Sequence, residues 1–231
     1  MINHKRSRYD LRQAARHSVG KRSKTPIGPI RVAAPMLFGK KFLPDAIRAF
    51  LVKYPETRIN LNLSDEILDY AAEGIDVAIR IGRLQDSTFR ARKLADNDRI
   101  LCASPSYFDG HDIPLQPSDL EQHECIVFVG EDQWRLRNRR KDVLVKVRGR
   151  FDTNSAEMAT QACLDGLGIA LRSLWDIAHD LDKGRLVRVL PDFQVPTEMA
   201  VYAIYPPGRF TSLAAKAFVG LVKERMSSPN D

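Results

Sequence analysis

Arg80 is a candidate for binding a small anion. It lies inside the run DVAIRIG (76–82), where Val77, Ile79 and Ile81 alternate as one face of a strand, so Arg80 belongs to the opposite face. The carboxyl ends of such strands are where α/β proteins hold ligands, and a planar guanidinium suits a carboxylate. The pattern is compatible with an anion contact and equally with a structural ion pair to an acidic neighbour.

Two predicted helix starts offer a second kind of anion-binding group. One follows a strand at Pro35-Met36-Leu37, and the other follows a strand at Thr153-Asn154-Ser155. The first turn of a helix has unpaired backbone N–H groups and a partial positive charge, which suit a carboxylate. Asn154 and Ser155 fit two interpretations, because an N-cap side chain can close its own helix with or without touching a ligand.

Catalytic motifs are missing from the sequence. It has no GxSxG elbow, no HExxH, no Walker-type phosphate loop and no GxGxxG after a strand. Histidines and acidic pairs fall in segments where we expect them to be solvated: His4, His17, His111, His123, His179, Asp65-Glu66 and Glu131-Asp132. Three widely spaced cysteines, Cys102, Cys125 and Cys163, are expected to be free buried thiols. We therefore expect no enzymatic activity, no cofactor and no metal.

The charge of the chain is concentrated at its beginning. Among 231 residues with 44% hydrophobic content, the net charge is +7, and residues 1–27 carry eight Lys or Arg against the single acid Asp10. The remaining residues contain 28 basic and 28 acidic side chains. This basic leader is expected to be a flexible, solvated tail, with nonspecific phosphate binding as the alternative. It lacks the apolar stretch of a secretory signal, so we expect a cytoplasmic protein.

The elements that must position these residues alternate between strand and helix. IRVAAP is predicted as a buried strand, LFGKKFLPDAIRAFLVKYP as a helix and RINLNLS as a half-buried strand. A short helix with Leu68, Ala71 and Ala72 is predicted to end at Gly74 before the DVAIRIG strand. This β-α-β-α-β series favours an α/β fold with a largely parallel sheet.

The second half predicts another sheet and a return to the first. We expect subdomain I to comprise residues 28–102 and 198–231, and subdomain II to comprise residues 103–197, with a ligand cleft between them. WRLRNRRKD is predicted as the basic tip of a hairpin, and SAEMATQACLDGLG as a helix. The last helix, TSLAAKAFVGLVKERM, has Thr211 as its expected cap.

From about Gly28 to Met226, the sequence resembles the effector-binding domain of LysR-type transcriptional regulators. The likeness is carried by EGIDVAIRIG, GPIRVAAPMLFGKKFLPDAIRAFLVKYPE, CASPSYF, PSDLEQHECIVF, Trp134 before a basic hairpin, GLGIALRSLWDIAHDLDKGRLVRVLPDF and AAKAFVGLVKE. The resemblance implies two Rossmann-like subdomains of the type-2 periplasmic-binding-protein kind. It also implies a homodimer and a small-molecule inducer held between the subdomains.

The resemblance also implies which residues contact the inducer. They are Met36, Leu37, Arg80, Gly82, Ser104, Asn154 and Ser155, with Arg172 as a further anion partner where many relatives have proline. Met36-Leu37 replaces a hydroxyl residue that is frequent in relatives, so a ligand there meets backbone N–H groups and apolar surface. Given the helix starts and arginines, we expect a small organic acid.

The start of the chain departs from the family pattern. LysR-type regulators normally begin with a winged helix-turn-helix and a linker helix, which do not fit before Gly28. The hypothesis is therefore a ligand-sensing domain that controls DNA binding only through a helix-turn-helix domain absent from this chain, with no membrane partner. Two rivals share the architecture, namely a solute-binding protein of transporter type and an enzyme, and a third takes the leader as a nucleic-acid contact.

Overall fold

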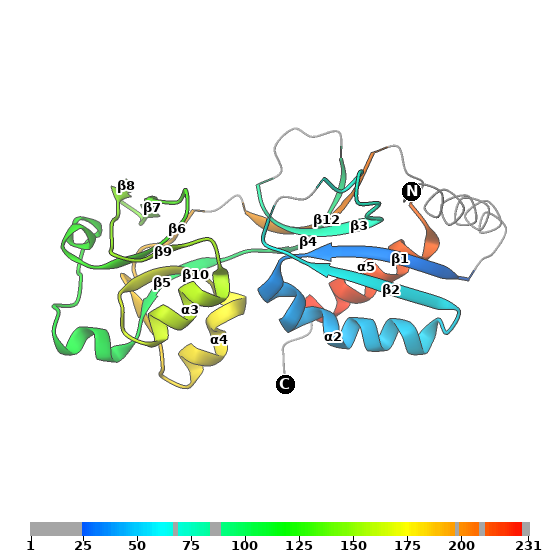
Figure 1. Ribbon diagram of the computed structural model, residues 1–231. Helices are drawn as coiled ribbons and strands as arrows, with labels where there is room; N and C mark the ends of the chain where they lie inside the picture. Colours follow the sequence, from blue (N-terminus) through cyan, green and yellow to red (C-terminus); the bar gives the residue numbers. More distant parts are fainter. Residues whose placement is uncertain (1–24, 67–68, 84–88, 197–198, 208–210, 228–231) are drawn as a thin grey trace, which may run out of the picture. The chain divides into compact units, whose positions relative to one another are not determined.

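A computed structural model describes residues 25–66, 69–83, 89–196, 199–207 and 211–227. The chain forms two compact units (Figure 1): the first runs up to Ala95 and resumes at Ala200, and the second spans Asp96–Met199. The sequence analysis predicted that the first subdomain would continue to residue 102. In the structure the chain enters the second unit at Asp96, so the strand Arg99–Ala103 belongs to the second unit. Most of the predicted leader, residues 1–24, lies outside the described residues.

The first unit is a five-stranded sheet with the order β2-β1-β3-β12-β4. Its strands are β1 (Gly28–Ala34), β2 (Thr57–Leu63), β3 (Val77–Gly82), β4 (Arg90–Asp96) and β12 (Ala200–Tyr205). β2 and β3 both pair with β1 in parallel, and β12 pairs with β3 in the antiparallel direction. The predicted parallel sheet is thus confirmed for β1 to β3 and becomes mixed where the chain comes back from the second unit.

Two helices pack together in the first unit: α2 (Met36–Lys53) and α5 (Leu213–Ser227) (Figure 1). Helical spacing places Phe38, Leu43, Ala46 and Phe50 on the buried side of α2. Phe50 meets Phe218 of α5 edge to face, with ring centroids 5.5 Å apart. The periodicity of both segments therefore predicted the helices and most of the faces that they bury. Leu51 of α2 and Leu213 of α5, which the helical spacing also places on those faces, are exposed.

Two local predictions in this unit were wrong. Residues 70–74 form a single turn in place of the predicted short helix, and Leu68 of that helix lies outside the described residues. Asp69 Oδ1 accepts hydrogen bonds from the backbone N–H groups of Ala71 and Ala72, and Gly74 closes the turn with φ +69°. At the start of α5, Ser212 and not Thr211 caps the helix, accepting a hydrogen bond from the Ala215 N–H at 3.1 Å.

The second unit contains a five-stranded sheet with the order β11-β5-β10-β6-β9. These strands are β5 (Arg99–Ala103), β6 (Cys125–Phe128), β9 (Asp152–Thr153), β10 (Ile169–Ser173) and β11 (Val187–Val189). β6, β9 and β10 are parallel, whereas β5 is antiparallel to both β10 and β11. The direction of β5 decides where several predicted site residues lie.

Further elements of the second unit cover the sheet. The α-helices are α3 (Ala156–Leu164) and α4 (Leu174–Asp182), and the 3-10 helices are η1 (Pro105–Asp109) and η2 (Pro117–Gln122). β7 (Gln133–Arg137) pairs with β8 (Asp142–Lys146) as the predicted hairpin. One core contains Trp134, Leu136 and Leu120, and a second contains Cys163 and Ile177. Across the described ranges, no helix has the length and apolarity to cross a bilayer.

Candidate functional site

In the first unit, three strand ends meet at one edge of the sheet. Ala34 and Leu63, the last residues of β1 and β2, are register partners, and β3 runs parallel to β1. Met36 at the start of α2, Asp65 after β2 and Gly82 at the end of β3 therefore belong to the same edge. Parallel sheets bind ligands at this edge because the loops and helix starts that follow their strands are gathered there.

The start of α2 is partly closed by an acidic side chain. The Met36 backbone N–H donates to Asp65 Oδ1 at 2.9 Å. Met36 and Leu37 are half-buried, and the N-cap residue Pro35 provides no capping side chain. Asp65 was expected to be solvated, and sequence reasoning missed this contact because the two residues come from different strand ends.

Arg80 has an aromatic partner. Its Nη1 donates to the hydroxyl of Tyr70 at 2.9 Å, and its guanidinium carbon lies 5.8 Å from the centre of the Tyr70 ring. Within the part of the chain that the structure describes, Arg80 forms no ion pair. Gly82, two residues further, has open space where a Cβ would stand. The strand that carries Arg80 therefore ends beside open space.

The second unit has a matching edge where β6, β9 and β10 end. Asn154 and Ser155 follow β9, and Ser155 Oγ accepts a hydrogen bond from the Met158 N–H at 3.3 Å, as a helix cap does. Asn154 is exposed, and its amide has no hydrogen-bond partner among the described residues. Ser155 is therefore occupied by its own helix, whereas Asn154 is available to a ligand.

An ion pair at this edge was not foreseen from the sequence. Because β5 runs antiparallel to β10, its first residue Arg99 pairs in register with Ser173 at the end of β10. Arg99 Nη2 lies 2.6 Å from Glu131 Oε2, and the arginine side chain is 13% exposed. Glu131 was expected to be solvated, and the only sequence signal for this pair was its position just after the β6 strand.

Arg172 is buried in a network of its own unit. Its Nη2 donates to Asp176 Oδ2 and to the Ala156 carbonyl, both at 2.8 Å, and its Nε donates to Thr160 Oγ1 at 2.9 Å. The arginine and aspartate side chains are only 8% and 6% exposed. Arg172 therefore anchors the first turn of α3 beneath Ser155, and a direct contact with a ligand stays a prediction.

Ser104 lies away from the other predicted residues of the second unit. It follows the last residue of β5, whose carboxyl end lies beside the beginning of β10 and not beside the end of β9. Its hydroxyl is buried and lies 2.8 Å from Ser106 Oγ. In the first unit the structure thus groups Met36, Leu37, Arg80 and Gly82 at one edge. In the second unit it groups Asn154 and Ser155, and it places Ser104 at the other end of the sheet.

His123 is the one described histidine that is buried, which corrects the expectation that it is solvated. The Tyr107 hydroxyl accepts a hydrogen bond from the Glu124 N–H at 3.0 Å and lies 3.1 Å from His123 Nδ1. Which of the two groups donates in this second contact depends on the tautomer of His123. Burial lowers the pKa of His123. Within the described ranges, no group of three His, Cys, Asp or Glu residues is placed to hold a metal ion.

Comparison with known proteins agrees with this architecture. The family model described as the LysR substrate binding domain matches residues 23–227. The chain belongs to this family. The resemblance noted from the sequence is thereby confirmed, and so is the α/β fold with two subdomains of the periplasmic-binding-protein type.

Individual relatives of this LysR-type domain are named as regulators. The chain is 36% identical to the HTH-type transcriptional regulator DmlR of Escherichia coli K12 over 86% of its length, and 32% identical to the HTH-type transcriptional activator TtdR of the same strain over 89%. It spans 66% and 68% of those two proteins. PtxR of Pseudomonas aeruginosa, at 31% identity, is likewise named as an HTH-type transcriptional regulator.

Solved structures of the family align over most of the domain. The regulatory domain of CrgA from Neisseria meningitidis aligns with 86% of this chain and 98% of its own, at a TM-score of 0.75 and 27% identity. Full-length AphB, a virulence activator of Vibrio cholerae, aligns with 94% of this chain and 75% of its own, at a TM-score of 0.75 and 29% identity.

Proposed function

We propose that this LysR-type domain binds a small organic acid between its two units. The observation that carries the proposal is Arg80, whose guanidinium is held by Tyr70 at the strand-end edge and has no carboxylate partner among the described residues. A charged group fixed in this way is preorganised for an incoming carboxylate, to which its planar fork can make two parallel hydrogen bonds. The carboxylate of the ligand then takes the place of an acidic side chain that would otherwise pair with Arg80.

Neighbouring groups complete the proposed contact on the first unit. Gly82 leaves open space beside the strand end, so a ligand can approach the backbone. The start of α2 contributes the partial positive charge of its helix, while Met36 and Leu37 contribute apolar surface. Asp65 already accepts the Met36 N–H, so we assign the main anion contact to Arg80 and the apolar part of the ligand to Met36 and Leu37.

The second unit contributes through the start of α3. The exposed amide of Asn154 can donate to a ligand oxygen while Ser155 caps the helix. Arg172 positions this helix start from below through the Ala156 carbonyl. A ligand that contacts both edges stabilises one relative orientation of the two units, because its binding energy is available only in that orientation.

The regulatory output is part of the same proposal. The curated relatives are HTH-type regulators that extend beyond the part matched here. We infer that ligand binding in a homodimer of such domains, in the cytoplasm, changes the arrangement of attached helix-turn-helix domains and so controls transcription. In this proposal, ligand binding changes the arrangement of the helix-turn-helix domains, and the ligand is not chemically converted.

A thermal-shift screen tests the ligand class. We expect at least one compound from a panel of aliphatic and aromatic carboxylates to raise the melting temperature, because a ligand that binds the folded state stabilises it. Arg80→Ala and Asn154→Ala are expected to reduce that shift, while the exposed control Arg90→Ala leaves it unchanged. A stabiliser whose effect survives both substitutions would remove these residues from the site, and amines that stabilise better than acids would reject the ligand class.

A further inference from the structure

The hairpin β7–β8 carries a dense positive charge on a region, residues 28–231, whose total charge is neutral. Residues 135–150 contain eight Lys or Arg and the single acid Asp142, whereas residues 28–231 as a whole contain 28 of each sign. Asp142 is shared by Arg135 and Arg137, and Arg150 pairs with Glu124. The turn residues Arg139, Arg140 and Lys141, which we call the hairpin tip, form no ion pair with any described residue.

The hairpin tip is held in a defined turn. Asn138 Oδ1 accepts hydrogen bonds from the backbone N–H groups of Arg140 and Lys141, both at 2.9 Å, and the Asn138 N–H donates to the Lys141 carbonyl. The start of the turn is tied to the rest of the unit because the Arg137 N–H donates to the Gln194 carbonyl at 2.8 Å. Three cations on a fixed turn lose less backbone entropy on meeting a partner than they would on a loose loop.

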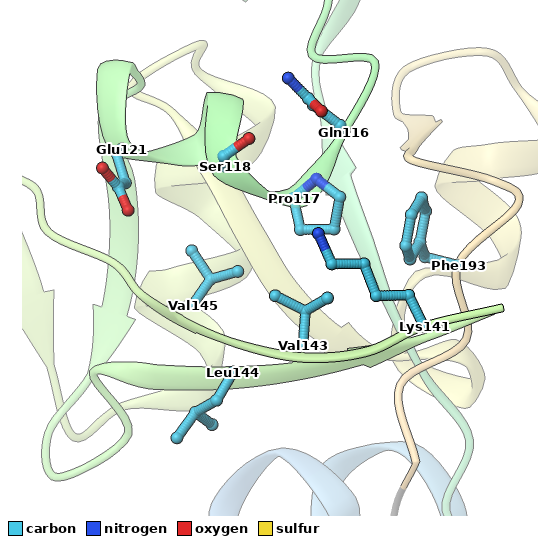
Figure 2. Close-up of a pocket in the computed structure, with 9 residues that line it drawn as sticks. All are labelled: Gln116, Pro117, Ser118, Glu121, Lys141, Val143, Leu144, Val145 and Phe193. Carbon is cyan, nitrogen blue, oxygen red and sulfur yellow. The ribbon is translucent and has the colours of Figure 1, made fainter.

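A small pocket lies next to the hairpin tip (Figure 2). Its volume is about 190 Å³, and its apolar lining comes from Pro117, Val143, Val145 and Phe193. Lys141 reaches over Val143 toward Pro117, whereas Glu121 lies on the opposite side of the view. An apolar cavity of about 150 Å³ is known to accept benzene, so this pocket has room for one aromatic or branched aliphatic side chain.

We propose that the hairpin tip and this pocket together form a docking site for an acidic segment of a partner protein that carries one large apolar side chain. The apolar side chain fills the pocket as an anchor, and the flanking carboxylates meet Arg139, Arg140 and Lys141. Interfaces of this kind gain most of their affinity from one buried anchor, while surrounding charges give orientation and association rate. Glu121 repels carboxylates at the far side of the pocket, so the acidic residues extend toward the tip.

A protein segment fits these features better than a nucleic acid. Phosphates satisfy the cations equally well, but a duplex backbone has no aliphatic or aromatic side chain with which to fill the pocket. The docking site lies wholly within the second unit, and none of its residues belongs to the proposed ligand edges. Its failure and the failure of the ligand proposal are therefore separate results.

Fluorescence anisotropy on the full chain tests the proposal with defined probes. The first probe is a labelled twelve-residue peptide of Asp and Glu with one central Phe, the second has Ser in place of Phe, and the third is a labelled duplex of random sequence. The variants are Arg139→Ser with Arg140→Ser at the tip, and Ser118→Phe, which places a ring in the pocket from its exposed rim. Arg90→Ser with Arg92→Ser on β4 is the control of equal charge loss.

We expect the Phe peptide to bind at low salt and to lose about fivefold in affinity in the tip variant, with no change in the control. The Ser peptide should bind at least fivefold more weakly than the Phe peptide, and Ser118→Phe should remove that advantage while unfolding at the same temperature as the parent chain. Equal binding of both peptides, insensitivity to the tip variant or absence of peptide binding overturns the proposal. A further contrary result would be duplex binding that is lost in the tip variant, combined with equal affinity for the Phe and Ser peptides. That result would identify a nucleic-acid surface and overturn the proposal.

Discussion

Arg80 and Tyr70 are joined by a 2.9 Å hydrogen bond in which the guanidinium donates to the phenolic oxygen. The tyrosine lies in the turn before β3 and is 9% exposed, so a buried ring fixes the direction of a half-buried charge. This relationship makes Tyr70 a positioning residue for the proposed anion site. It also explains how an arginine is tolerated inside a largely apolar strand, since its charge stays near the strand end and its polar edge has a partner.

Removing the Tyr70 hydroxyl should weaken ligand binding without removing the charge. Tyr70→Phe is expected to raise the Kd of the carboxylate found in the thermal-shift screen by about fivefold, which corresponds to the loss of one hydrogen bond of about 1 kcal/mol. Titration of the thermal shift with that ligand measures the change. Tyr54→Phe, at the end of α2, is the matched control, and an equal loss in both variants would argue against a positioning role for Tyr70.

The buried pair Arg172–Asp176 should be essential for the stability of the second unit. Arg172→Met leaves the 6%-exposed Asp176 carboxylate without its cationic partner, and breaking such a pair costs about 3–5 kcal/mol. Urea unfolding followed by tryptophan fluorescence measures the loss, with the exposed Arg188→Met as control. The double variant Arg172→Met with Asp176→Leu should recover much of it. A single variant as stable as the parent would contradict the structural role assigned to Arg172.

His123 should make stability fall as the pH is lowered. Burial lowers its folded-state pKa below the ordinary value near 6.5, and nearby His111 acts in the same direction, while Asp119 and Asp112 oppose it. The unfolded state therefore binds a proton more readily, so stability declines as the pH falls through about 6.5 toward the folded pKa. Protonation also fixes Nδ1 as a donor in its 3.1 Å contact with the Tyr107 hydroxyl.

His123→Asn tests this pH dependence because an amide can donate to or accept from the Tyr107 hydroxyl without titrating. Unfolding midpoints in urea, measured from pH 7.5 to 5, should fall more steeply for the parent chain than for the variant. His111 and Asp119 interact with His123, so the difference between the two curves reports His123 together with its coupling to these neighbours. Parallel curves would mean that His123 does not carry the dependence.

Two glycines should respond in opposite ways to alanine. A Cβ at Gly149 would lie 1.9 Å from the Cys125 carbonyl oxygen, so Gly149→Ala must displace backbone and is expected to destabilise by about 1–3 kcal/mol. Gly220, inside α5, has open space around the same position, and Gly220→Ala is expected to stabilise by up to about 1 kcal/mol. Thermal melting of the two variants compares them directly, and loss of stability at Gly220 would contradict the open space seen there.

The sequence alone determined the order and type of most elements. Alternation in DVAIRIG and helical spacing in α2 are short-range signals, because the faces of a strand or helix are fixed by residues a few positions apart. The cap at Ser155 is also a short-range feature, because its hydroxyl accepts a hydrogen bond from the N–H of Met158, three residues further along the chain. The same is true of the basic turn at Arg139 and Arg140, which follows from local turn chemistry at Asn138. The family could be recognised for the same reason, since the stretches that resemble it are local and follow one another along this chain.

The tertiary structure decided which of these residues share a site. The antiparallel direction of β5 brings Arg99 to the edge that holds Asn154 and carries Ser104 to the opposite one. Contacts across strand ends place Asp65 on the start of α2, and contacts between β10, α3 and α4 bury Arg172. Strand direction and burial depend on pairings between residues tens of positions apart, and their energies arise only when the core assembles. The periodicity of a single segment therefore contains no information about strand direction or burial.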